Sequence, residues 1–210
     1  MRDSPTLAIY YSSGVTNSDG LTPGARLAGA CVWPGYFFPM QIPANGLVVL
    51  IGAAGSGKSA FARRTFPSEA IVSSDDIRRS IRPTGRSHRY DVFDQLLQKT
   101  ESRLMAGMLT VVDATNTDWM RRGELIRVAR QYGRPAIAIV LALPLEVCLA
   151  QNAARLEKVP AATIRRQMGD IARDLDRLDL EGFESVQVFR SKNEVAGAQI
   201  ELATVPVDET

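Results

Sequence analysis

The sequence predicts an α/β domain in which a parallel β-sheet is flanked by helices. Short continuous apolar runs at residues 47–51 and 136–143 are typical of strands covered on both faces. Segments with helical spacing separate these runs, and regular alternation of strands and helices is typical of a parallel sheet. The chain has 210 residues, of which 45% are hydrophobic, so it is long enough to bury one core.

Each predicted strand is a short run of apolar and β-branched residues. In chain order, the strands are expected at residues 47–51, 70–73, 109–113, 136–143 and 184–190. The helices are expected at residues 58–65, 75–81, 91–107 and 119–132, with two more helical segments around Pro160 that end near Leu180. In the third helix, Val92, Leu96 and Leu104 fall on one stripe, which indicates an amphipathic helix. The fourth ends at Gly133-Arg134-Pro135, a glycine and proline stop signal.

The two ends of the chain differ from the middle. Residues 1–39 are rich in Gly, Ser, Thr and Pro without a sustained period, which predicts an irregular extension. Met40 is either the start of the domain or the true start of translation. The domain is expected to span residues 40–190, followed by a polar tail over 191–210 in which 199–205 is a candidate edge strand.

Composition excludes several classes of protein. There is no run of about 18 apolar residues, so no membrane-spanning helix is expected. Residues 1–5 lack the layout of a secretory signal, and Cys31 and Cys148 form neither a disulfide framework nor a metal cluster. We therefore expect a cytoplasmic protein, and the sequence makes no prediction of its oligomeric state.

The strongest chemical signal is Gly52-Ala53-Ala54-Gly55-Ser56-Gly57-Lys58-Ser59, which matches the pattern G-x-x-x-x-G-K-S/T between a strand and a helix. Its glycines let the backbone wrap a phosphate at a helix N-terminus. Lys58 is expected to reach the β and γ phosphates, and the Ser59 hydroxyl to ligate Mg²⁺. The motif predicts a site for ATP or another nucleoside triphosphate. Its predicted nucleotide-binding residues are Gly52, Ala53, Ala54, Gly55, Ser56, Gly57, Lys58, Ser59 and Ala60.

Charged residues follow the second and third predicted strands, at the edge of the sheet where parallel strands line a ligand crevice. Asp75 can accept a proton from an attacking hydroxyl there. It can also cap the helix that follows, and the two roles are compatible. Arg78 lies one helical turn further on and can hold a phosphate beside that hydroxyl. Asp113 is placed to hold Mg²⁺ directly or through water.

Positive charge is carried mainly by arginine, with 21 Arg against 4 Lys and a formal net charge of +2. Genomic nucleotide bias and phosphate recognition by guanidinium groups both explain this composition. Seven of the arginines and His88 fall between Arg63 and Arg89, where acidic residues are sparse. This clustering favours a phosphate-facing role.

Residues 40–190, about seven tenths of the chain, resemble the kinase module of bacterial and phage 5′-hydroxyl polynucleotide kinases. The motifs that carry the resemblance occur in the family's order and spacing. They are Gly55-Ser56-Gly57-Lys58-Ser59, Ser74-Asp75-Asp76-Ile77-Arg78, Val112-Asp113-Ala114-Thr115-Asn116 and Leu143-Pro144-Leu145-Glu146-Val147-Cys148. The resemblance implies a P-loop NTPase-type sheet with a helical lid, ATP and Mg²⁺ as cofactors, and nucleic acid 5′ ends as partners. The implied reaction is transfer of the γ-phosphate to the 5′-hydroxyl of RNA or DNA.

The resemblance also implies roles for single residues. Asp75 matches the general base, and Arg78 matches an arginine that contacts the phosphate next to the 5′-hydroxyl. Residues 152–168 match the lid over the nucleotide, in which Arg155 matches a phosphate-contacting arginine and Val159-Pro160 lies close to the acceptor nucleoside. The predicted catalytic residues are Lys58, Asp75, Arg78 and Arg155. Further predicted substrate-binding residues are Asn116, Arg122 and Val159, and the predicted metal ligands are Ser59 and Asp113.

The chain departs from the family at Gln151, where a second lid arginine often stands, unless Arg165 or Arg166 substitutes for it. It carries neither a D-x-D-G-T phosphatase motif nor a ligase motif. Two other functions stay open: a kinase acting on a nucleoside, sugar or antibiotic, and a non-catalytic NTP-binding regulator. The pair of Asp75 and Arg78 argues against the regulator, because a switch needs no acceptor base.

Overall fold

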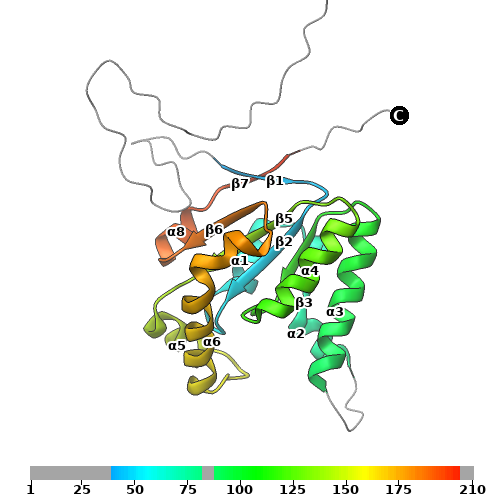
Figure 1. The fold of residues 1–210 in the computed structure, drawn as a ribbon. Coiled ribbons are helices and arrows are strands. Elements are labelled where there is room, and N and C mark those ends of the chain that lie inside the picture. The colour runs from blue at the N-terminus through cyan, green and yellow to red at the C-terminus, as the bar shows by residue number, and fades with distance from the viewer. Residues whose placement is uncertain (1–38, 82–87, 204–210) are drawn as a thin grey trace, which may run out of the picture.

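Within residues 39–81 and 88–203, which the computed structural model describes, five strands form a parallel sheet in the order β3-β4-β2-β5-β6 (Figure 1). The strands of this sheet are β2 (Leu47–Gly52), β3 (Ile71–Ser73), β4 (Thr110–Asp113), β5 (Ala136–Leu141) and β6 (Ser185–Phe189). β2 is central, and it pairs in parallel with β4 on one side and with β5 on the other. The predicted α/β class with a parallel sheet is confirmed.

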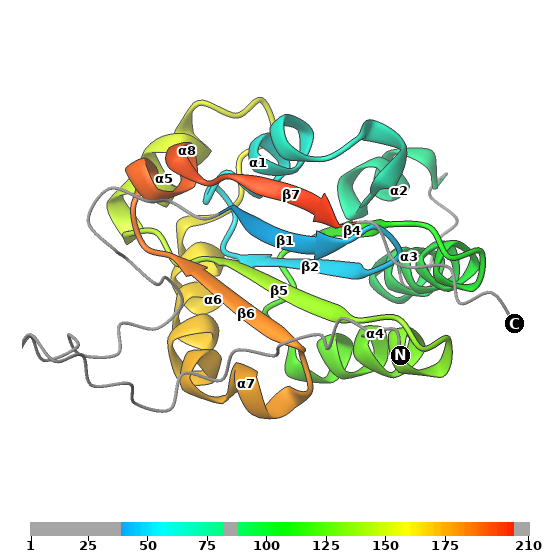
Figure 2. The same ribbon diagram turned by 90° about the horizontal axis from the view of Figure 1, so that it is seen from above.

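Helices follow the strands on both faces of this sheet (Figure 2). The described helices are α1 (Lys58–Thr65), α2 (Ser74–Ser80), α3 (His88–Met105), α4 (Trp119–Gln131), α5 (Leu145–Ala153), α6 (Ala161–Asp174), α7 (Leu178–Glu181) and α8 (Lys192–Gly197). Short 3-10 turns lie at Ser68–Ala70 and Leu175–Arg177. None of the described helices is long and apolar enough to cross a membrane.

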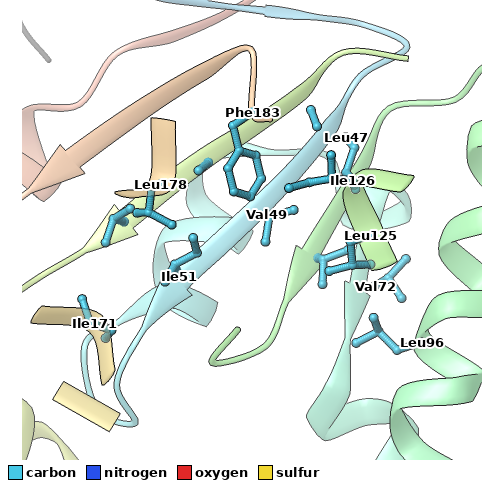
Figure 3. Close-up of a cluster of buried hydrophobic side chains, with 14 of the residues drawn as sticks. Leu47, Val49, Ile51, Val72, Leu96, Leu125, Ile126, Ile171, Leu178 and Phe183 are labelled. Carbon is cyan, nitrogen blue, oxygen red and sulfur yellow. The ribbon is translucent and has the colours of Figure 1, made fainter. Parts of the chain in front are cut away.

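Alternate residues of β2 point to opposite faces, as the period of a strand requires. Leu47, Val49 and Ile51 are buried on one face, where α3, α4, α6 and α7 pack (Figure 3). Val48 and Leu50 are buried on the other face, against Phe61 of α1, Phe66 just after α1 and Phe189 of β6. Burial on both faces explains why the β2 sequence is apolar throughout.

The chain end predicted as a tail packs onto the domain as far as residue 203. β7 (Ile200–Ala203) pairs in parallel with β1 (Met40–Pro43) in a separate small sheet, with Met40 opposite Ile200. Ile42, Val195 and Ile200 join the core on the α1 face. The strand expected at 199–205 therefore forms, but its partner is β1, which was expected only as the start of the domain.

Some predictions lie outside the described residues. These are residues 1–38 of the irregular extension predicted over 1–39, with Cys31, and Arg82 and Arg86 of the arginine-rich segment. The side chains of His88 and Arg89, at the start of α3, also lie outside them.

Candidate active site

The candidate site is a cavity of about 1190 Å³ at the carboxyl ends of the strands. β2, β3 and β4 end beside it, at Gly52, Ser73 and Asp113, and these ends are aligned because Ser73 and Leu50 both lie opposite Asp113 in the sheet. α5 and α6 lie on one side of this edge, and α2 and α3 lie on the other (Figure 1). The position beside the central strand, where the chain turns to opposite sides of the sheet, is the usual ligand crevice of an open parallel sheet.

The glycine-rich loop after β2 has a backbone shape that requires glycine. Gly55 and Gly57 have φ values of 81° and 91°, in the left-handed region that side chains disfavour. A Cβ atom on Gly55 would lie 2.2 Å from the carbonyl oxygen of Cys148, so the loop packs directly on α5. Ala54, Gly55, Gly57, Lys58, Ser59 and Ala60 line the cavity. Gly52, Ala53 and Ser56 are buried at the base of the loop, where they shape it from below.

Lys58 is buried beneath this loop. Its ammonium donates to the carbonyl oxygens of Gly52 at 2.8 Å and Ala53 at 2.9 Å, and to the Ser56 hydroxyl at 3.3 Å. Burial lowers the pKa of Lys58 to about 8, because removing the ammonium from water disfavours its charged form. An anionic phosphate in the loop would favour the charged form of Lys58, since it would give this buried ammonium a counterion.

Ser59 and Asp113 form the oxygen pair suited to a divalent cation. Asp113 is 5% exposed, and burial raises the pKa of its carboxyl, while a hydrogen bond with the Ser59 side chain and the charge of Lys58 oppose that shift. Mg²⁺ prefers hard oxygen ligands and is usually held by one or two carboxylates together with substrate phosphates and water. The described residues hold no cluster of three or more His, Cys, Asp or Glu for a metal. One hydroxyl and one carboxylate beside the loop therefore fit Mg²⁺ that arrives with a nucleotide.

Asp75 stands at the start of α2, where it pairs with two arginines. Its Oδ1 lies 2.5 Å from the Arg78 Nη1, and its Oδ2 lies 3.4 Å from the Arg155 Nη2. The N-cap of α2 is Ser73, whose hydroxyl accepts the Asp76 N–H at 3.3 Å. The capping role is thus filled by another residue, and the Asp75 carboxylate faces the cavity with its arginines.

The segment predicted as a lid, residues 152–168, comprises the end of α5, a turn and the first half of α6, and one side chain fixes the turn. Asn152, itself buried, donates to the Val159 carbonyl at 2.9 Å and accepts from the Val159 N–H at 3.0 Å. This pair of bonds closes the loop that carries Arg155 to Asp75. Gln167 of α6 accepts the Ala54 N–H at 2.9 Å and so joins the lid helix to the phosphate loop.

The departure at Gln151 lies on this wall. Gln151, Arg155, Val159 and Arg166 line the cavity, whereas Arg165 is not among its lining residues. Arg166 is therefore the better placed of the two arginines considered as substitutes for the missing lid arginine.

Arg122, which was predicted to bind substrate, is not among the residues that line the cavity. Its side chain is 1% exposed and bridges Asp174 at 3.0 Å and Glu181 at 2.5 Å, so it holds α4 to the end of α6 and to α7. It also donates to the Asn116 carbonyl at 2.9 Å. Its neighbour Arg121 lines the cavity in its place.

Asn116 has a mainly local role in the structure. It is buried with a φ of 48°, and its amide donates to the Leu50 carbonyl at 2.7 Å. Asn116 lines the cavity, but its side-chain donor is used in the hydrogen bond that joins the loop after β4 to β2. A direct contact with substrate is not needed to explain this residue.

Two groups of cavity residues were missed in the sequence. A second cavity of about 240 Å³ adjoins the phosphate loop and is lined partly by α8, through Lys192, Val195 and Ala196. The pattern Ser191-Lys192-Asn193-Glu194 is a capping-box signal that could have located this helix, and the Ser191 hydroxyl does accept the Glu194 N–H at 3.2 Å.

The other group consists of apolar and aromatic residues from α3 and α4, namely Val92, Phe93, Leu96 and Trp119. Their spacing is that of core residues, so no signal in the sequence distinguishes these cavity residues from residues of the hydrophobic core.

Comparisons with known proteins agree with this architecture. Residues 47–173 match the family described as AAA domain. Among solved structures, the chain is similar to one in the Pnkp1/Rnl/Hen1 RNA repair complex, with a TM-score of 0.55, 21% identity and 70% of this chain covered. The match covers 48% of that chain, about half its length. A gluconokinase from Sinorhizobium meliloti 1021 gives a TM-score of 0.49 at 17% identity over 74% of this chain and 87% of its own.

A further match is the APS kinase of Mycobacterium tuberculosis, with a TM-score of 0.43 and 19% identity over 54% of this chain and 71% of its own. At 21% identity, the match to the RNA repair structure shows a shared fold. Together with the family match over residues 47–173, it confirms the resemblance seen in the sequence motifs at the level of the fold.

Proposed function

The chain belongs to the AAA domain family, and from that premise we propose that it is an ATP-dependent kinase acting on the 5′-hydroxyl of RNA or DNA ends. The observation that carries this proposal is the placement of Asp75 between Arg78 and Arg155, in the same cavity as Lys58. A carboxylate in that position can take a proton, and cations stand on either side of it. A non-catalytic nucleotide switch has no use for this arrangement.

In the proposed reaction, the oxygen of the 5′-hydroxyl attacks the γ-phosphorus while Asp75 takes the proton of that hydroxyl. The bond between the γ-phosphorus and the oxygen of the leaving ADP breaks. Lys58 and Arg155 stabilise the negative charge on the transferring group. Arg155 can leave Asp75 at little cost, because both side chains are 40% exposed and such an ion pair contributes about 0–1 kcal/mol. Mg²⁺ held by Ser59 and Asp113 would neutralise charge on the β and γ phosphates.

The nucleoside part of ATP is expected in the second cavity, which shares Gly57, Ala60 and Gln151 with the larger one. Leu143, Val195 and other apolar side chains line it and suit a flat, weakly polar ring. The triphosphate would then cross the glycine-rich loop toward Asp75.

Arg78 supports a nucleic acid acceptor over an uncharged one. Its side chain is 62% exposed on the cavity wall, so its fork of donors is accessible to a ligand. A 5′-hydroxyl polynucleotide always presents a phosphate one nucleotide inward, and a guanidinium binds two of its oxygens at once. The similarity in fold to a chain of an RNA repair complex supports the same acceptor class.

A small-molecule kinase is the second candidate, because further carboxylates besides Asp75 and Asp113 line the cavity. Asp118, Glu157 and Asp170 are among these lining residues. Acidic side chains accept hydrogen bonds from sugar hydroxyls, whereas they would repel a phosphodiester.

The test is transfer of labelled γ-phosphate to a nucleoside and to its 3′-monophosphate. We expect the wild type to prefer the monophosphate, and Arg78→Ala to lower kcat/KM for it by roughly 10- to 100-fold, the usual worth of a charge-assisted hydrogen bond. Arg79→Ala is the matched control, because Arg79 is similarly exposed on α2 but pairs with Asp76, and neither residue lines the cavity. Equal transfer to both acceptors by the wild type would favour the small-molecule kinase, and no transfer to any acceptor would favour the regulator.

A further inference from the structure

The cavity contains an apolar and aromatic wall, formed by Val92, Phe93, Leu96 and Trp119, on the side occupied by α3 and α4. Trp119 is 61% exposed although it lines a cavity that is otherwise rich in charged side chains. A large apolar surface left open in a concave, charged site is typical of a ligand-binding surface rather than of packing. The aromatic wall thus has room for a flat apolar group.

Local structure fixes this wall in place. Asp118 caps α4 by accepting the Met120 N–H at 3.0 Å, which sets Trp119 as the first residue of the helix. The guanidinium of Arg121 lies over the Phe93 ring, 4.8 Å from its centroid, and the Asp118 carboxylate lies 3.8 Å from Arg121. The Arg121 guanidinium therefore already covers the Phe93 ring, and the exposed Trp119 lies two residues before Arg121 and lines the same cavity.

We propose that Trp119, with the stacked Phe93 and Arg121, forms the subsite for the nucleobase of the acceptor's 5′-terminal nucleotide. This inference rests on the proposed function. It adds that the enzyme recognises the base of the acceptor as well as its phosphate. Every nucleobase has a π-face that stacks on an indole or a guanidinium plane, so such a subsite selects an aromatic acceptor without reading its sequence. A sugar or polyol has no such face.

The position of the wall assigns it to the acceptor rather than to ATP. Asp75 and Arg78 lie on α2, which packs against α3, and the wall shares their cavity. The second cavity, where the nucleoside of ATP is expected, is lined instead by α1, α5 and α8 residues such as Phe61, Gln151 and Val195. A base on the aromatic wall would therefore lie in the same cavity as Asp75 and Arg78.

The test compares two acceptors that differ only in the base: a deoxynucleoside 3′-monophosphate and the abasic 1,2-dideoxyribose 3-phosphate. We expect the wild type to prefer the first by about tenfold or more in kcat/KM, which is the usual effect of one stacked base. Trp119→Ala should remove most of that preference and leave the KM for ATP unchanged, and Trp119→Phe should retain it. Met120→Ala is the matched control, because Met120 is the next residue, 58% exposed, and outside the cavity lining.

The outcomes separate this inference from the proposed function. If the wild type phosphorylates both acceptors equally, or if Trp119→Ala keeps the preference, the base subsite is wrong while the kinase with a 3′-phosphate contact stands. If neither acceptor is phosphorylated, the proposed function itself fails and the subsite with it. Because Trp119 is exposed, thermal unfolding of Trp119→Ala should match the wild type, so a loss of preference would not reflect a loss of folding.

Discussion

The nucleotide end and the acceptor end of the cavity are built in different ways. At the nucleotide end, Lys58 and Asp113 are buried and the backbone shape is fixed by glycines that a side chain cannot replace. At the acceptor end, Asp75 is 40% exposed, Arg78 62% and Trp119 61%, and these side chains come from α2 and α4. The nucleotide end is thus formed by buried groups and the backbone of the fold, whereas the acceptor end is formed by exposed side chains.

This difference bears on how the site can change. A substitution at the nucleotide end disturbs packing, because buried groups contact the backbone of β2, β4 and α5. A substitution at the acceptor end disturbs little besides the ligand, since exposed residues away from special features change stability by about 0.5 kcal/mol or less. One P-loop framework can therefore serve different acceptors, and the acceptor must be argued from individual side chains. The predictions that follow test this contrast.

The largest effect is expected at Asp75. Asp75→Asn removes the group that takes the acceptor proton, so kcat should fall by about 10²-fold or more, the usual range for a general base. ATP binding should survive, because the phosphate loop is intact. Steady-state transfer and equilibrium binding of ATP measure the two separately. Turnover close to that of the wild type would remove Asp75 from the mechanism.

The nucleotide end is tested by Gly55→Ala. The added Cβ would lie 2.2 Å from the Cys148 carbonyl oxygen at a φ of 81°, so the loop or α5 must move. We expect a stability loss of about 2–4 kcal/mol and roughly tenfold to hundredfold weaker ATP binding. Gly123→Ala is the matched control, since a Cβ there meets nothing within 4 Å. Unchanged ATP affinity in Gly55→Ala would mean that the loop tolerates the shift.

The protonation of Lys58 tests the difference between the two ends, because Lys58 is a buried charged group and belongs to the nucleotide end. The pKa of Lys58 is lowered to about 8, so in the free protein the ammonium is lost as pH rises through that value. ATP requires the charged form, and its affinity should fall about tenfold between about pH 7 and about pH 9, with proton uptake on binding above pH 8. Calorimetry in buffers of different ionisation enthalpy measures this uptake. Lys58→Met should abolish it, and uptake that persists in that variant would assign the proton to another group.

The same contrast explains what the sequence could predict. The strands β2 and β5 were predicted because burial on both faces leaves an apolar run, and the phosphate loop because its shape demands glycine at fixed spacing. β1 could not be predicted, since it is short and its partner strand lies 160 residues away at Met40↔Ile200. Arg122 was assigned to the substrate and Arg121 was passed over. The two are adjacent on one helix, and only Asp174 and Glu181, distant in sequence, decide which of them faces inward.

The smallest effect is expected at Asn152, which acts through the lid that carries Arg155. Its side chain makes hydrogen bonds of 2.9 and 3.0 Å to the carbonyl and N–H of Val159, and so holds the turn that places Arg155 beside Asp75. Each such bond contributes about 0.5–1.5 kcal/mol net, so Asn152→Ala should loosen the turn without unfolding the domain. We expect kcat to fall by roughly three- to tenfold, because Arg155 is then in place for only part of the time.

Asn152→Asp provides a second comparison, since it keeps the acceptor for the Val159 N–H but sets a buried carboxylate oxygen against the Val159 carbonyl. Its kcat should fall at least as far as that of Asn152→Ala. If the turn only positions Arg155, the KM for the acceptor should stay constant in both variants. A rise in the acceptor KM with constant kcat would instead mean that the turn binds the acceptor directly. In that case the lid turn, including Val159, is part of the acceptor site.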